Sequence, residues 1–235
     1  AEARCCRVLG VLSRLRGDYP SALSWLEQAR DAFTALDDRA GLTLTLIEIG
    51  SVWWRRGEYA SARHETETGL AMARVSADKR AVASGLHTLG LVAEDQGDYL
   101  AARAYFEESL ALERETGDMR GVSTSLNYLG IVANRQGDYV TSRALFEEGL
   151  AIRREIGDKQ GIAASLNNLG IAANYQGDQI SARALHEQSL ALRREIGEKW
   201  GIASSLINLG FVAQEQGEYV KAQALFEESL ALERE

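Results

Sequence analysis

Apolar residues recur along this chain at three-to-four-residue spacing, and the pattern restarts every 40 residues. One such run includes Leu126, Leu129 and Val132 and is followed by Gly137. This spacing predicts an amphipathic helix, and the glycine can adopt the left-handed conformation that commonly ends one. A second apolar face, with Phe146 and Leu150, predicts another helix before the pattern repeats.

The repetition runs through the whole sequence without an insertion or deletion. A Leu-Gly or Ile-Gly pair stands near the middle of each predicted first helix, and another glycine follows seven residues after the glycine of that pair. A period between 20 and 50 residues is typical of solenoids. We therefore expect an all-α fold of about twelve antiparallel helices in one array of six repeats. Their approximate limits are 1–40, 41–80, 81–120, 121–160, 161–200 and 201–235.

The turns between helices carry their own signals. Asp138 is placed to cap the second helix of its repeat, and Asp158 to cap the first helix of the next one. Pro20 stands at the start of a second helix, where its missing N–H costs little. Asp37 and Ala77 occupy joints where later repeats have glycine, so we expect those helix ends to be less sharply fixed.

These motifs resemble the tetratricopeptide repeat. The resemblance is carried by Leu126, Leu129, Gly130 and Ala133, followed by Gly-Asp-Tyr from Gly137, and by the pairing of a small residue with an aromatic four positions later. The 40-residue length is similar to repeats of spindle-orientation adaptors, kinesin light chains, bacterial pheromone receptors and signalling ATPases. The resemblance implies a right-handed superhelix. Departures occur where Thr66 and His186 replace the aromatic and Gln179 replaces the tyrosine; we expect His186 to be a partly buried substitute for phenylalanine.

The resemblance also implies a concave groove lined by the first helices. Transferring the groove positions by register gives an apolar stripe flanked by carboxamides, which can pair with a peptide backbone. The predicted ligand is a peptide, extended or helical. The predicted groove residues are Leu91, Asn127, Tyr128, Ile131, Asn134, Asn167, Ile171, Asn174, Phe211 and Gln214.

Each of these assignments has a structural alternative. Asn168 and Asn208 are better explained as repeat residues that bond to neighbouring helices. For Asn127, Asn134, Asn167 and Asn174, ligand contact and a solvated helix face are equally consistent with the sequence.

A secondary contact surface is predicted near the start of the chain. Tryptophan is enriched at binding hot spots, although one member of the pair Trp53-Trp54 is expected in the core. Arginines on the first helices of the first two repeats could meet an acidic partner, or could simply be solvated charges near helix ends. The residues assigned to this surface are Arg7, Arg14, Trp54 and Arg55.

Composition limits the classes of partner. The net charge of −8 disfavours a nucleic-acid backbone, and no apolar run approaches the ~18 residues of a membrane-spanning helix. Neither a nucleic-acid nor a membrane partner is therefore expected. The two cysteines, Cys5 and Cys6, are adjacent on one helix and favour a reduced, cytoplasmic setting. No signal peptide is visible, and the first residues look like an excerpt of a longer protein.

Catalysis has little support in the sequence. His64, His87 and His186 fall in different repeats and different columns, so no metal-ligand or catalytic spacing is visible, and no cofactor is predicted. The predicted function is non-enzymatic binding of a protein or peptide, as a scaffold or as the sensing arm of a larger signalling regulator. The alternative is a structural module that self-associates through uncapped solenoid ends.

Overall fold

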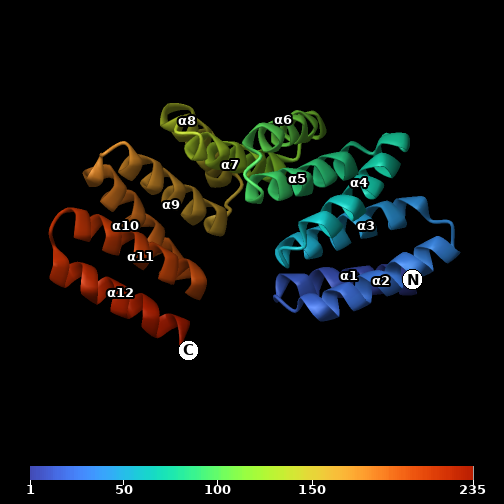
Figure 1. Ribbon diagram of the computed structural model, residues 1–235, viewed down its shortest axis with the longest axis horizontal. Coiled ribbons are helices and arrows are strands. Elements are labelled where there is room, and N and C mark those ends of the chain that lie inside the picture. The colour runs from blue at the N-terminus through green and yellow to red at the C-terminus, as the bar shows by residue number, and fades with distance from the viewer. Residues whose placement is uncertain (235) are drawn as a thin grey trace. The chain divides into compact units, whose positions relative to one another are not determined.

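The computed structural model describes residues 1–234, and within them the chain forms helices joined by tight turns (Figure 1). The helices in order are α1 (Glu2–Leu15), α2 (Tyr19–Ala35), α3 (Arg39–Arg55), α4 (Tyr59–Val75), α5 (Lys79–Asp95), α6 (Tyr99–Thr116), α7 (Met119–Arg135), α8 (Tyr139–Glu155), α9 (Lys159–Tyr175), α10 (Gln179–Ile196), α11 (Lys199–Glu215) and α12 (Tyr219–Glu233). No strand occurs among the described residues, so the predicted all-α class is confirmed.

The chain divides into two compact units, Ala1–Asp118 and Met119–Glu235. Unit 1 contains α1 to α6, and unit 2 contains α7 to α12. Within each unit, consecutive helices pair, and the second helix of a pair packs on the first helix of the next pair. This is the packing expected of stacked helical repeats. That all six repeats form a single array stays a prediction.

The helix ends follow the chemistry of the turn residues. Gly137 has φ of 79°, and the neighbouring Asp138 side chain accepts a hydrogen bond from the Thr141 N–H at 3.1 Å. Asp158 caps α9 in the same way, through the Gly161 N–H at 3.0 Å. Since a cap satisfies an otherwise unpaired donor, the Gly-Asp pair both ends one helix and begins the next.

The two joints without glycine keep the same turn. Asp37 has φ of 49° and Ala77 has φ of 55°, which are left-handed values like those of the glycines at later joints. The expectation of less sharply fixed ends is not met in the backbone geometry, because the helices on both sides hold the turn in place. The left-handed conformation costs an L-residue about 1–2 kcal/mol.

Close approach of paired helices explains the glycine in each first helix. A Cβ added to Gly130 would lie 2.5 Å from Cε1 of Phe146, and one added to Gly170 would lie 2.6 Å from Cε1 of His186. His186 therefore takes the place of the aromatic ring, and it is 1% exposed. The predicted substitution is confirmed, with burial more complete than expected.

Candidate functional site

In each first helix of unit 2, one partly exposed apolar residue follows the glycine that packs on the partner helix. Gly130, Gly170 and Gly210 point into the second helices, and successive side chains on an α-helix are turned about 100° apart. The next residue in each helix therefore lies at the edge of the helix contact, where Ile131 still packs against core residues. We call these residues, Ile131, Ile171 and Phe211, the apolar stripe.

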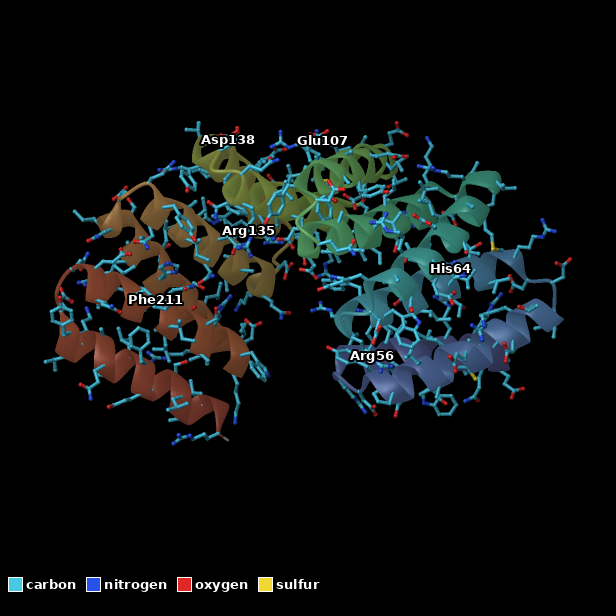
Figure 2. All side chains as sticks on the ribbon, viewed as in Figure 1. Arg56, His64, Glu107, Arg135, Asp138 and Phe211 are labelled. Carbon is cyan, nitrogen blue, oxygen red and sulfur yellow. The ribbon has the colours of Figure 1, made fainter. Side chains whose placement is uncertain are left out.

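The stripe is accessible. Ile131 and Ile171 are half-buried, whereas Phe211 on α11 is 51% exposed (Figure 2). The Phe211 ring packs edge-on against Phe226, with 5.4 Å between centroids. All three side chains keep some exposed surface, and that they contact a ligand stays a prediction.

Asn127 and Asn167, in contrast, are not available. They are 8% and 6% exposed, and the oxygen of each accepts a hydrogen bond at 2.9 Å, from the Nδ2 of Asn168 and Asn208 respectively. Asn167 also lies 3.2 Å from Nδ1 of His186. These two groove assignments are therefore corrected, because the next repeat covers both amides. The expectation that Asn168 and Asn208 bond to neighbouring helices is confirmed.

The second carboxamide column lies closer to the surface. Asn134 and Asn174 are half-buried, and Gln214 is exposed. Asn174 donates to Glu215 at 3.4 Å, while the Oδ1 atoms of Asn134 and Asn174 have no hydrogen-bond partner among the described residues. Both oxygens are buried, so a ligand cannot reach them in this conformation. In this column, the exposed amide of Gln214 is the one that a ligand can reach.

A hollow of about 490 Å³ adjoins the stripe between α7, α8 and α9. Tyr139 and Tyr175 stack beside it, with centroids 5.5 Å apart and planes 4° apart, and the Tyr175 side chain is 62% exposed. Arg135 also lines the hollow and lies near the end of α7 (Figure 2). The column that follows the carboxamides reads Arg135, Tyr175 and Glu215, so the sequence gives no shared chemistry by which Tyr175 could have been found. Tyr128, a predicted groove residue, is half-buried on the same helix as Arg135.

Comparison with models of protein families identifies the type of repeat. Models described as tetratricopeptide repeat match residues 81–155, 121–195, 202–235 and 3–28. The chain belongs to the tetratricopeptide repeat family. A comparison with curated proteins gives no match.

Solved tetratricopeptide-like structures share the fold. BtubC (BKLC) from P. vanneervenii is 20% identical with a TM-score of 0.74, and the match covers 95% of this chain and 91% of that one. A Rap protein complexed with Competence and Sporulation Factor is 11% identical with a TM-score of 0.81, covering 99% and 75%. A putative kinesin light chain from Podosopora anserina is 19% identical with a TM-score of 0.64, covering 80% and 93%.

In unit 1 of this tetratricopeptide chain, the predicted groove residue Leu91 is only 5% exposed. A side chain with so little surface belongs to the interior and cannot accept a ligand's side chain. The assignment of Leu91 to the groove is corrected for that reason.

The secondary contact residues of unit 1 are largely engaged with other side chains. Trp54 donates through Nε1 to Asp95 at 2.6 Å, and the Arg55 guanidinium lies 4.4 Å from the Trp54 ring centroid. Arg14 pairs with Glu48 at 3.2 Å, and Arg7 is half-buried. Trp54 and Arg14 thus link consecutive first helices. As expected for one of the two tryptophans, Trp53 packs against a core cluster.

Two histidines of the tetratricopeptide fold, His87 and His186, are neutral at pH 7. Burial lowers the pKa of His87 to about 4, and burial together with Arg193 lowers the pKa of His186 to about 4. No group of three or more His, Cys, Asp or Glu side chains within residues 1–234 could hold a metal ion. No helix in the described part of the chain is long and apolar enough to cross a membrane.

Proposed function

We propose that unit 2 binds a peptide segment of a partner protein along the apolar stripe, as the partner-recruiting arm of a larger regulator. The observation that carries the proposal is the partly exposed row of Ile131, Ile171 and Phe211 together with a hollow that has an exposed aromatic ring, Tyr175. Exposed aromatic side chains at the centre of a surface are typical anchors of protein interfaces.

The polar surroundings suit a peptide backbone. Gln214 is exposed on the same helix as Phe211 and offers an amide donor and acceptor, whereas the oxygens of Asn134 and Asn174 are buried. Apolar positions between such groups can receive side chains while the amides pair with backbone N–H and C=O groups. The similar Rap structure holds Competence and Sporulation Factor, which supports the choice of a peptide as the ligand class.

The test is selection of peptides from a random dodecapeptide library on the wild-type chain, followed by titration of a selected peptide against variants. Phe211→Ser and Tyr175→Ala should each weaken binding about tenfold, because each removes on the order of 60 Å² of apolar contact. Ile180→Ser is the matched control, since Ile180 is 83% exposed at the start of α10 and lies outside the stripe.

The control should bind as the wild type does, and thermal unfolding should show that all three variants are folded at the temperature of the binding assay. The proposal fails if the library yields no peptide above background. It also fails if the selected peptides bind Phe211→Ser and Tyr175→Ala as tightly as the wild type.

A further inference from the structure

The same ion pair joins the start of the first helix to the end of the second in two helix pairs of this fold. Lys79 at the start of α5 pairs with Glu115 near the end of α6, with 2.7 Å between Nζ and Oε2. The same pair recurs 80 residues later, where Lys159 at the start of α9 lies 2.6 Å from Glu195 of α10. A carboxylate therefore sits beside the cation that begins the first helix.

The pair formed by α3 and α4 keeps the cation and lacks the carboxylate. Arg39 begins α3, and the position equivalent to Glu115 is Val75 at the end of α4. The Arg39 side chain is 80% exposed, and the ion pair it makes among the described residues is a 3.8 Å contact of its Nε with Oδ1 of Asp37, which is 91% exposed. A contact of that length between two exposed groups is weak.

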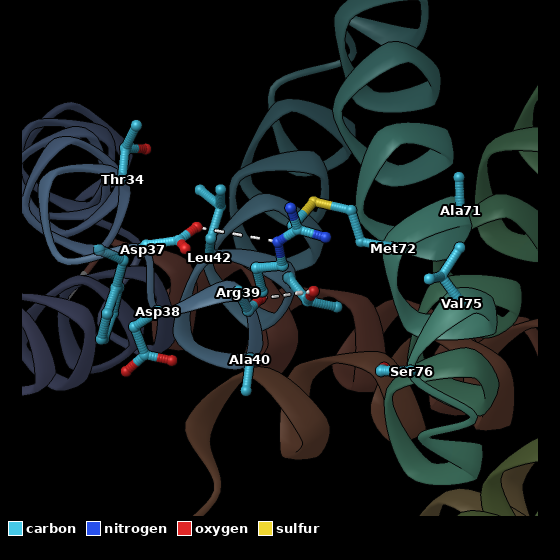
Figure 3. A pocket seen from close by; sticks show the side chains of 12 residues that line it. Thr34, Asp37, Asp38, Arg39, Ala40, Leu42, Ala71, Met72, Val75 and Ser76 are labelled. Atoms are coloured by element: carbon cyan, nitrogen blue, oxygen red, sulfur yellow. Dashed lines mark hydrogen bonds and ion pairs between the residues drawn. The ribbon is translucent and has the colours of Figure 1, made fainter.

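An open apolar hollow of about 460 Å³ lies next to Arg39 (Figure 3). Its lining includes Phe33 from α2, Leu42 from α3, and Met72 and Val75 from α4. Hollows of this size accommodate small organic ligands. The missing glutamate and the hollow occur at the same place, which gives the site an apolar part and an adjacent cation.

We propose that this hollow binds a small aliphatic carboxylic acid. Its carboxylate lies on the Arg39 guanidinium, in the role that Glu115 plays for Lys79, and its hydrocarbon chain lies against Leu42, Met72 and Val75. No covalent step is involved.

The rim of the hollow carries one guanidinium, Arg39, and two carboxylates that each already have a contact of their own. Asp38 is engaged as the cap of α3, where its Oδ1 accepts from the Gly41 N–H at 2.9 Å. Asp37 occupies Arg39 through one nitrogen only, and a guanidinium has five N–H donors in a fixed fork. An incoming carboxylate can therefore be held by the remaining donors, in the paired geometry that arginine favours.

The two methionines of the chain provide a direct test. Met72 lines the hollow, and Met119 lies in unit 2. In the full chain labelled with ¹³C at the methionine methyl groups, sodium octanoate below its micelle-forming concentration should shift the Met72 signal and leave Met119 unmoved. Octan-1-ol, which has the same chain and no charge, should bind at least fivefold more weakly.

Three variants locate the charge that matters. Arg39→Gln should weaken octanoate binding about fivefold, and Val75→Glu should weaken it at least as much by restoring the internal carboxylate. Both positions are more than three-quarters exposed, so folding should be retained. Lys159→Gln removes an equivalent cation in unit 2 and should leave octanoate binding unchanged.

A Met72 signal that does not move at saturating octanoate overturns the proposal. Equal affinity for octanoate and octan-1-ol, or unaltered octanoate binding in Val75→Glu, also overturns it, because either result removes the role of the carboxylate. None of these results bears on peptide binding by unit 2.

Discussion

Asn167 holds together two repeats of unit 2, and its replacement by alanine tests whether the buried amides are structural. Its Oδ1 accepts from Asn208 Nδ2 at 2.9 Å and lies 3.2 Å from Nδ1 of His186. Because the pKa of His186 is lowered to about 4, the ring is neutral at pH 7. A carbonyl oxygen cannot donate, so the His186 Nδ1 must carry the proton and donate to Asn167.

The cost of Asn167→Ala follows from these contacts. The lost hydrogen bond from Asn208 is worth about 1 kcal/mol, and leaving the buried His186 N–H unpaired costs a further ~1–3 kcal/mol. The better helix propensity of alanine returns roughly 0.5 kcal/mol. We therefore expect a loss of about 2 kcal/mol in the free energy of unfolding, measured by urea denaturation followed by circular dichroism.

Asn127→Ala is the matched control. Asn127 is equally buried and accepts one hydrogen bond from Asn168, but the ring in the neighbouring column is Phe146, which has no N–H to leave unpaired. Asn127→Ala should therefore lower the free energy of unfolding by less than Asn167→Ala does, with a difference of at least about 1 kcal/mol.

A double-mutant cycle with His186→Phe isolates the ring contact. With phenylalanine in place of the histidine, Asn167→Ala should cost about as little as Asn127→Ala does, since the unpaired donor is gone. Equal losses for the two asparagines in the wild-type background, or no coupling between positions 167 and 186, would refute this reasoning.

Three further expectations test other parts of the fold. The folded-state pKa of His186 is lowered to about 4 from 6.5, so the contribution of the neutral ring to stability is complete above pH 6.5 and is lost as pH falls toward 4. Between pH 7 and 5, the free energy of unfolding measured by denaturation should therefore fall by about 2 kcal/mol less in His186→Phe than in the wild type. Ala77→Gly should raise the free energy of unfolding by about 0.5–1 kcal/mol by relieving the left-handed strain at φ of 55°, and no gain would contradict that strain. Self-association through the solenoid ends predicts a molecular mass that rises with concentration in light scattering, and a strictly monomeric species would dismiss it.

Much of the fold was readable from the sequence because the features concerned are local. A cap such as Asp138 acts on an N–H three residues away, and a turn glycine such as Gly137 needs only its own backbone freedom. The 40-residue period then placed equivalent side chains in columns, which gave the accessible positions of Ile131, Ile171 and Phe211.

The errors lie where one repeat meets the next. Helical periodicity tells which face of a helix a residue occupies, but not how closely the neighbouring repeat covers that face. Asn127 and Asn167 were placed on the correct helices and are nevertheless covered by the amides of the following repeat. Tyr175 was missed for the converse reason, since a column that reads arginine, tyrosine and glutamate shows no shared chemistry although its members are exposed.

The contacts between repeats narrow the chemistry of the proposed peptide surface. Four hydrogen bonds join residues 41 positions apart on successive first helices, from Asn168 to Asn127, Asn208 to Asn167, Trp54 to Asp95 and Asn174 to Glu215. Most of these polar side chains therefore bond to the neighbouring repeat, which leaves fewer of them for a ligand. What remains accessible in unit 2 is mainly the apolar stripe, Tyr175 and Gln214. A peptide partner should consequently gain more of its affinity from apolar and aromatic side chains than from a continuous ladder of backbone amide contacts, so that serine at Phe211 weakens binding more than alanine at Gln214 does.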